Sequence, residues 1–243
     1  MSTTGRVLVV DVGTSSVRAA IMGADGTLGA GHERELLPDS PADGLVEFDA
    51  EVLASTCLDL ARAALDADGP VDAVGISDQR GSTVVWDRAT GTPIGPGLGW
   101  QDLRTIGACL ALRAEGIRVG PNQSATKLMW LLEQLDDPAR AVDLCFGTVD
   151  TWVAWTLSGG TLHVTDATNA AVTGLQNRDL SGWDEGVLGK LGIPVAMMPA
   201  IIDSAGFAGE AHALPGAPPI TAIRASGHAI VRSFPMPRES ITM

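Results

Sequence analysis

RVLVVDVGTSSVRAAIM, residues 6–22, is the most informative segment for the fold, because two apolar runs enclose a short polar segment. Arg6–Val10 and Val17–Met22 are rich in β-branched residues, which predicts two strands. Between them, Asp11-Val12-Gly13-Thr14-Ser15-Ser16 predicts a polar turn. Gly13 permits tight curvature there, and the hydroxyls of Thr14, Ser15 and Ser16 can line a phosphate pocket together with neighbouring amides.

Two charged residues flank this turn and extend its possible chemistry. Asp11, at a strand end, could hold a metal-bound water near a nucleotide, and Arg18 adds a cation. The segment has neither the GK[ST] of a Walker A loop nor a GxGxxG fingerprint. An ordinary polar hairpin is the alternative interpretation of the same residues.

Outward from the turn, strands and helices alternate. A turn over Ala24-Asp25-Gly26-Thr27 and a third strand through about Leu37 complete a hairpin group. A helix is predicted over Asp49–Asp66, with an apolar face of Val52, Leu53, Cys57, Leu60, Ala61 and Ala64. The further predicted elements are strands at Val71–Ile76 and Ser82–Trp86 and helices at Arg104–Arg113, Ser124–Leu135 and Thr148–Leu157. This order favours an α/β fold with a mixed sheet covered by helices.

Composition excludes several classes of function. The 243 residues include 16 basic and 29 acidic side chains, a net charge of −13, whereas nucleic-acid binders usually present a basic face. Cys57, Cys109 and Cys145 form no CxxC pair, which argues against a disulfide framework or zinc site and favours the reducing cytoplasm. The short apolar run before Asp11 is not a signal peptide, and no stretch reaches the roughly 18 apolar residues of a membrane span. We therefore expect a cytoplasmic protein.

The charge changes sign near residue 210. Residues 1–210 carry a net charge of −15, whereas residues 211–243 carry +2 and five prolines. Pro235-Met236-Pro237 would interrupt a helix or a central strand. Two interpretations stay open: a peripheral segment of the same domain, or a tail that has lost an ancestral pattern.

A set of motifs in the order and approximate spacing of one family covers residues 5–210. The blocks are Asp11–Arg18, Gly75–Arg80 with Thr83–Asp87, Thr90–Ile94, Trp100–Thr105, Phe146–Trp152 and His163–Ala170. In these blocks the sequence resembles the FGGY carbohydrate kinases, and among them the glycerol kinases.

The resemblance implies a fold and a site. Members fold as two actin-like (ribonuclease H-like) domains, with ATP and sugar in the cleft between them. Residues 1–210 would be the first domain and residues 211–243 its degenerate end, with the second domain absent. Asp11, Gly13, Thr14, Ser15, Ser16 and Arg18 fall on nucleotide-phosphate positions, and Asp11 also lies at the position near Mg²⁺. Arg80 matches an arginine that binds polyol hydroxyls, and Trp100 matches an aromatic wall.

The chain departs from the family at three site positions. An acidic residue that binds a terminal hydroxyl is replaced by Gly81, and a tyrosine that packs on glycerol is replaced by Asn122. The aspartate that acts as general base is replaced by Ser226, which cannot accept a proton at neutral pH. Loss of such a base typically lowers the rate by about 10²–10⁴-fold. His228 has a suitable unperturbed pKa but lies two residues further on. Because Gly81 and Asn122 differ from the residues that bind glycerol, another polyol or sugar could be the substrate.

Three hypotheses follow. The first is an ATP-dependent polyol or sugar kinase domain whose second half is a separate chain, or which associates as a homo-oligomer through its exposed half-cleft. The second is a noncatalytic remnant or sugar-binding module, indicated by Gly81, Asn122 and Ser226. The third is an actin-like or Hsp70-like ATPase module. Such a module would not explain why Arg80 and Trp100 match polyol-binding positions.

Overall fold

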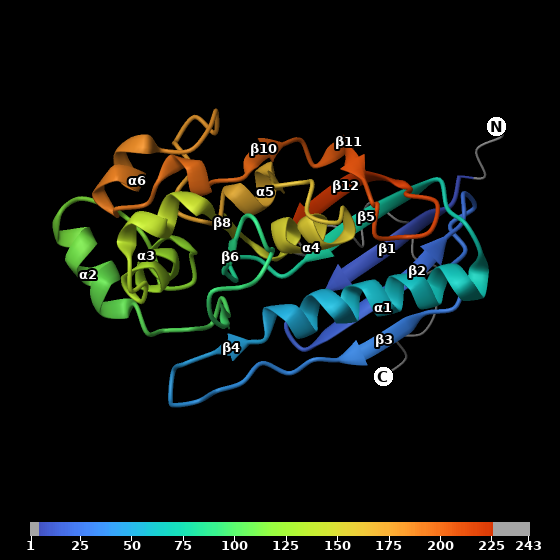
Figure 1. Ribbon diagram of the computed structural model, residues 1–243, viewed down its shortest axis with the longest axis horizontal. Helices are drawn as coiled ribbons and strands as arrows, with labels where there is room; N and C mark the ends of the chain where they lie inside the picture. Colours follow the sequence, from blue (N-terminus) through green and yellow to red (C-terminus); the bar gives the residue numbers. More distant parts are fainter. Residues whose placement is uncertain (1–4, 226–243) are drawn as a thin grey trace, which may run out of the picture.

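The computed structural model describes residues 5–225 (Figure 1). Its main sheet has six strands in the order β11-β12-β5-β1-β2-β3. Strands β1 (Val7–Val12), β2 (Ser16–Met22) and β3 (His32–Glu35) form an antiparallel meander, as the sequence predicts. Strand β5 (Ala73–Asp78) runs parallel to both β1 and β12 (Pro219–Ala225). The sheet is mixed, and the carboxyl ends of β1, β5 and β12 lie at one edge.

Two helices pack against one face of this sheet. Helix α1 (Ala50–Asp68) contacts β1 and β2, and helix α4 (Val149–Leu157) contacts β5 and β12. The Asp49 side chain caps α1 by accepting hydrogen bonds from the amides of Glu51 and Val52, which explains why the helix begins there. The predicted apolar face is buried except at Val52, which is 44% exposed. The sequence interpretation was wrong at Val52 because the following residue, Leu53, already points into the sheet.

A second group of elements lies beyond the end of the sheet (Figure 1). Strand β6 (Val84–Asp87) pairs with β8 (Leu144–Gly147), and β4 (Glu47–Phe48) pairs with β7 (Gly97–Leu98). Helices α2 (Ile106–Ala114), α3 (Ala125–Glu133) and α6 (Glu185–Lys190) gather on this side. This group has its own apolar core around Phe146, Leu128 and Leu188, separate from the core under the main sheet.

Short elements connect the two groups. Strands β9 (Val164–Asp166) and β10 (Ala200–Ile202) form a parallel pair, and helix α5 (Ala167–Ala170) follows β9 directly. Strand β11 (Ala205–Glu210) is the edge strand next to β12. The main sheet thus continues past Glu210, the residue at which the sequence analysis placed the end of the family pattern, to Ala225. Within residues 5–225, no helix is both long and apolar enough to cross a membrane.

Candidate functional site

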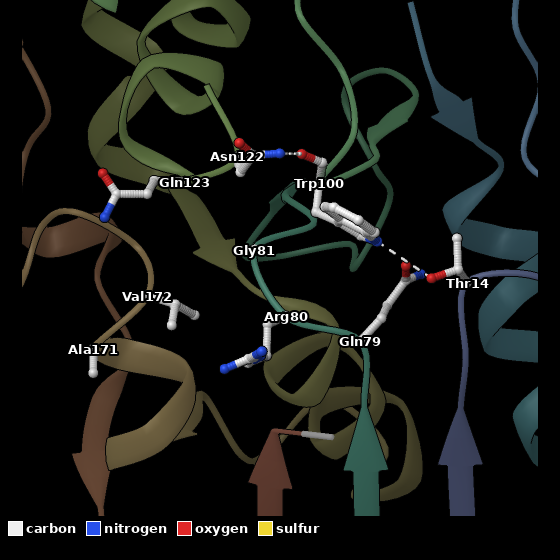
Figure 2. Close-up of a pocket in the computed structure, with 9 residues that line it drawn as sticks. All are labelled: Thr14, Gln79, Arg80, Gly81, Trp100, Asn122, Gln123, Ala171 and Val172. Atoms are coloured by element: carbon white, nitrogen blue, oxygen red, sulfur yellow. Dashed lines mark hydrogen bonds between the residues drawn. The ribbon is translucent and has the colours of Figure 1, made fainter. Parts of the chain in front are cut away.

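A pocket opens where the parallel strands end. Thr14 follows β1 and the Gln79-Arg80-Gly81 segment follows β5, so both segments meet at the carboxyl edge of the sheet (Figure 2). In α/β sheets, ligands bind at this edge because chain connections leave a crevice there. The pocket has a volume of about 520 Å³, within the range of small-molecule sites.

The pocket has two walls and a floor. Figure 2 shows Trp100, Thr14 and Gln79 on one side and Ala171 and Val172 on the other. Arg80 rises from the floor and points toward Val172, away from Trp100. The complete lining is Thr14, Gln79, Arg80, Gly81, Trp100, Asn122, Gln123, Ala171 and Val172. An aromatic side chain, a cation and several amides around one pocket can hold the carbon chain and the hydroxyls of a carbohydrate.

Hydrogen bonds fix Trp100 as a wall. Its indole Nε1 donates to Thr14 Oγ1 at 3.2 Å, which connects the wall to the tip of the β1–β2 hairpin. Its backbone N–H donates to Ser82 Oγ at 3.0 Å. Its carbonyl oxygen accepts from Asn122 Nδ2 at 3.2 Å and from Lys127 Nζ at 3.3 Å. Asn122 therefore braces the wall in addition to lining the pocket.

Lys127 is a buried cation behind this wall. Its side chain is fully buried, and desolvation lowers its pKa to about 8, although the negative charge of Asp102 opposes that shift. Asp102 is committed to Arg104, whose guanidinium also pairs with Glu47 at 2.7 Å and stacks 4.5 Å from the centre of the Trp130 ring. This cluster keeps the loop that carries Trp100 in one position.

Gly81 lines the floor of the pocket, where a larger residue would be strained. Its φ is +76°, a region that L-residues other than glycine rarely adopt, and a Cβ would lie 2.5 Å from the carbonyl oxygen of Asn122. Its own carbonyl oxygen accepts from Ser124 Oγ at 3.3 Å. The backbone of this chain thus favours glycine at this position.

The predicted phosphate turn is a tight hairpin beside the pocket. Gly13 N–H donates to the Ser16 carbonyl at 2.9 Å, so Thr14 and Ser15 form the tip, and a Cβ at Gly13 would lie 3.3 Å from that same oxygen. Of the six predicted phosphate-turn residues, Asp11, Gly13, Thr14, Ser15, Ser16 and Arg18, only Thr14 reaches the pocket lining. The other five lie along the adjoining hairpin.

Arg18 is not a free cation. Its guanidinium lies 2.9 Å from Glu33 Oε1 and 3.8 Å from Asp11 Oδ2. The Glu33 hydrogen bond raises the pKa of Arg18, and the same bond lowers the pKa of Glu33. All three side chains are partly exposed, so a phosphate could compete with the carboxylates for the arginine.

A buried network of acidic and amide side chains lies beneath the pocket, and we call Asp78, Asp150, Asp166 and Asn169 the carboxylate network. Asp78 ends β5; its Oδ1 accepts from Asn169 Nδ2 at 2.8 Å and its Oδ2 from the Asp150 amide at 3.2 Å. Asn169 Nδ2 also donates to Asp166 Oδ1 at 3.0 Å. All four residues are completely buried. The network joins the strand that leads to Arg80 to the helix that leads to Ala171 and Val172.

Burial and mutual repulsion perturb the carboxylates. Desolvation, followed by the charge of Asp150, raises the pKa of Asp78 well above its usual value. Desolvation raises the pKa of Asp150 to about 6, although hydrogen bonds from Thr148 and Thr165 favour its charged form. The network extends to β12, because Asp166 accepts from Thr168 Oγ1, which in turn accepts from the Ala225 amide at 3.1 Å.

The residues present fit a magnesium ion only through one carboxylate. Among the described residues there is no group of three or more His, Cys, Asp or Glu side chains that could hold a metal. Asp11 is single, partly exposed and at the hairpin beside the pocket. Mg²⁺ commonly keeps several waters and uses one or two carboxylates together with substrate phosphates. Asp11 could be the single carboxylate of such a site, with water and substrate phosphates as the other ligands.

The structure brings Thr14, Arg80, Gly81, Trp100 and Asn122 into one pocket, although the first and the last are 108 positions apart in the sequence. Sequence reasoning assigned no role to Gln79, Gln123, Ala171 or Val172, nor to the carboxylate network. The sequence did contain a signal for the carboxylate network: polar residues stand at the end of the apolar run 73–77 and within the apolar segment 149–157. The predicted base position, Ser226, and His228 lie outside the described residues.

Comparisons with known proteins agree with this geometry. Residues 6–215 match the FGGY family of carbohydrate kinases, N-terminal domain. The chain is similar to a glycerol kinase of Aromatoleum aromaticum, 41% identical over 236 residues that cover 89% of this chain and 48% of the relative. It is similar to one of Thermus brockianus, 42% identical over 227 residues that cover 86% and 46%. The chain spans about half the length of the curated relatives it matches.

Solved structures show the same fold. The structure resembles the glycerol kinase of Plasmodium falciparum with ADP, with a TM-score of 0.84 at 20% identity, covering 93% of this chain and 49% of the other. It resembles the xylulose kinase of Lactobacillus acidophilus, with a TM-score of 0.81 at 17% identity, covering 93% and 49%. The predicted α/β, actin-like (ribonuclease H-like) fold and the predicted family are confirmed. The chain belongs to the FGGY family of carbohydrate kinases and corresponds to its N-terminal domain.

Proposed function

We propose that this chain is the substrate-binding half of an ATP-dependent carbohydrate kinase that phosphorylates a small polyol or sugar. One observation carries the proposal. A pocket with an aromatic wall, a cation and three amides opens directly beside a hydroxyl-rich hairpin, and Trp100 connects the two through Thr14 at 3.2 Å. A carbohydrate in the pocket would present a hydroxyl toward phosphates at the hairpin.

The residues divide the work of phosphoryl transfer, which is mainly positioning and charge stabilisation. Arg80, Gln79 and Gln123 orient the hydroxyls, and Trp100 packs on the carbon chain. The hydroxyls of Thr14, Ser15 and Ser16 face the phosphates, and Asp11 would hold Mg²⁺ through water. Mg²⁺ supplies neutralisation of the phosphate charge. The substrate hydroxyl oxygen attacks the γ-phosphorus, the bond to the β-phosphate oxygen breaks to release ADP, and the hydroxyl proton leaves to water.

The base is the weak point of the site. Ser226 occupies the predicted position of the base and is not basic at neutral pH, so we expect slow transfer. The adenosine side of the nucleotide also needs a second wall, which we place on a region equivalent to the C-terminal half of the relatives. We place the protein in the cytoplasm, where ATP is available and the three free, buried cysteines stay reduced.

The test combines this chain with the C-terminal half of a glycerol kinase relative and measures ADP formation with glycerol and a panel of polyols and sugars. We expect slow turnover by the wild-type chain and a gain of about 10²–10⁴-fold from Ser226→Asp. Fast wild-type turnover would contradict the base assignment. Absence of turnover in both variants, together with absence of carbohydrate binding by calorimetry, would reject the kinase proposal.

A noncatalytic sugar-binding module is the second candidate, and Ser226 favours it. Carbohydrate binding by calorimetry without turnover, even in the Ser226→Asp variant, would support this alternative. An ATPase module of the actin or Hsp70 type predicts ATP hydrolysis that does not depend on any carbohydrate, and the same assay measures it.

A further inference from the structure

The outward side of helix α2 is apolar. Leu103, in the turn before the helix, is 42% exposed, and Ile106 and Leu110 within the helix are 50% and 63% exposed. The Ile106 amide donates to the Leu103 carbonyl at 3.1 Å, so these three residues, three and four positions apart, lie along one side. No charged side chain stands from position 105 to position 112, whereas the exposed face of a surface helix is normally charged or polar. We call Leu103, Ile106 and Leu110 the α2 stripe.

The described part of the chain leaves this stripe uncovered. Helix α2 lies at the outer end of the second group of elements, with α3 on its inner side (Figure 1). On that inner side Cys109 is buried, with its Sγ 3.4 Å from Thr126 Oγ1, and Leu112 packs against the apolar core. The helix is thus anchored by its other face, and the stripe points away from that core. Exposed apolar side chains grouped in this way commonly mark an interaction site.

We infer that the α2 stripe is a contact between two copies of this chain, which pair their α2 helices antiparallel about a two-fold axis. The inference does not depend on the proposed function. In such a contact the same patch meets itself, so Ile106 of one copy lies against Leu110 of the other. Gly107 stands between these two residues, and a Cβ built on it would meet no other part of the described chain within 4 Å. That gap allows the two helices to approach closely.

The charges at the two ends of the stripe are complementary in this arrangement. Asp43 stands beside the first end, because the Leu103 amide donates to the carbonyl of the next residue, Gly44, at 2.8 Å. Arg113 stands in the last turn of α2. Both residues are exposed, and within residues 5–225 neither forms an ion pair. Antiparallel pairing places Asp43 of each copy near Arg113 of the other and opposes the two helix dipoles. Parallel pairing would place like charges together.

The charge of the chain and the size of the stripe decide what kind of contact this is. A net charge of −13 makes two copies repel each other, so a surface without acidic side chains is where they approach most easily. Three partly exposed side chains bury far less than the roughly 800 Å² per partner of a stable interface. We therefore expect a weak, reversible dimer, with a dissociation constant on the order of 10⁻⁴ M.

The test is sedimentation equilibrium of the full chain over protein concentrations from about 1 µM to about 1 mM. We expect Leu110→Glu to weaken dimerisation at least about 10-fold, because it would bury two carboxylates against apolar side chains. The matched control is Leu28→Glu, at a leucine with a similar exposure of 61% in the turn between β2 and β3. It should leave the dissociation constant within about 2-fold, and circular dichroism checks that both variants fold.

Charge reversal tests the antiparallel arrangement. Asp43→Arg and Arg113→Asp should each weaken the dimer by about 3-fold or more, because each places like charges opposite each other at both ends of the contact. The double variant restores opposite charges, so its dissociation constant should return to within about 2-fold of that of the wild type.

A chain that stays monomeric at about 1 mM would overturn the inference. So would a dimer that Leu110→Glu leaves unchanged, that Leu28→Glu weakens equally, or that the double charge variant fails to restore. Binding of the C-terminal half of a glycerol kinase relative that Leu110→Glu abolishes would also overturn it, and would assign the stripe to that region instead.

Discussion

The pocket and the carboxylate network both adjoin the end of β5, and one is open to ligand whereas the other is sealed. In the network, Asp78 and Asp150 accept hydrogen bonds from protein donors, and neither is exposed. In the pocket, Arg80 is exposed and has no protein partner among the described residues. Asp78 is thus buried and paired within the protein, whereas Arg80, two residues later, is exposed.

The difference shows how the fold separates support from recognition. Buried polar groups must be paired within the protein because water cannot reach them. Exposed polar groups in a pocket keep their hydrogen-bonding capacity for a ligand. The network should therefore respond to mutation through stability, and the pocket through binding.

Removing a hydrogen-bond acceptor from the carboxylate network should lower the free energy of unfolding the most. Asp150 accepts from Thr165 Oγ1 at 2.8 Å, from the Asp166 amide at 3.1 Å and from Thr148 Oγ1. Asp150→Ala leaves these buried donors unpaired, and we expect the free energy of unfolding to fall by about 3 kcal/mol or more. Urea denaturation at pH 7 measures it, with exposed Asp136→Ala as the control, expected to change stability by less than about 0.5 kcal/mol. A loss below about 1 kcal/mol would contradict the role of Asp150.

Filling the floor of the pocket should have the next largest effect. Gly81→Ala combines a positive φ with a Cβ 2.5 Å from a carbonyl oxygen, and we expect a loss of about 2–3 kcal/mol in the free energy of unfolding. Gly116→Ala is the matched control, because Gly116 has φ of +85° and no heavy atom within 4 Å of a built Cβ. It should lose only about 1 kcal/mol. Equal losses in the two variants would show that the contact with Asn122 costs nothing.

The network should also make stability depend on pH. A carboxyl group can have a higher pKa in the folded state than in the unfolded state. Its contribution to the stability of the folded state is then complete at low pH and is lost as pH rises through the folded-state pKa. Asp78 and Asp150 both have raised pKa values, that of Asp150 about 6. The free energy of unfolding should therefore fall as pH rises from about 4 through 6 and above, by up to about 1.4 kcal/mol per pH unit for each group.

Asp78→Asn tests the assignment of that slope. The variant cannot ionise at position 78, so its unfolding free energy should decline less steeply between pH 4 and pH 8 than that of the wild type. Urea midpoints at one-unit intervals measure both slopes. An unchanged slope would mean that Asp78 does not titrate in this range.

The smallest effect concerns the connection between the pocket wall and the hairpin. Trp100→Phe keeps an aromatic face but loses the indole donor to Thr14, and Thr14→Val loses the acceptor. A double-mutant cycle on the free energy of unfolding should give a coupling of about 0.5–1.5 kcal/mol. A coupling near zero would mean that the wall and the hairpin are positioned independently.

Much of the fold follows from local patterns. The apolar runs on either side of Asp11–Ser16 became β1 and β2, and the predicted helices over Asp49–Asp66, Ser124–Leu135 and Thr148–Leu157 became α1, α3 and α4. Strands β8 to β11 were not predicted from sequence, because three of them have only three or four residues and β11 contains two glycines. Short strands depend on their partners more than on their own sequence.

The family, the hairpin and the positions of Arg80, Gly81, Trp100 and Asn122 within motifs can be predicted from the amino-acid order alone. Local chemistry and spacing suffice for these features. Three features follow from tertiary contacts: Arg18 is paired with Glu33, a side chain at position 81 would meet the Asn122 carbonyl, and Asp78 and Asp150 share a sealed site. Each of these depends on the distance between groups far apart in the chain, and hydrogen bonding, repulsion and desolvation act through that distance.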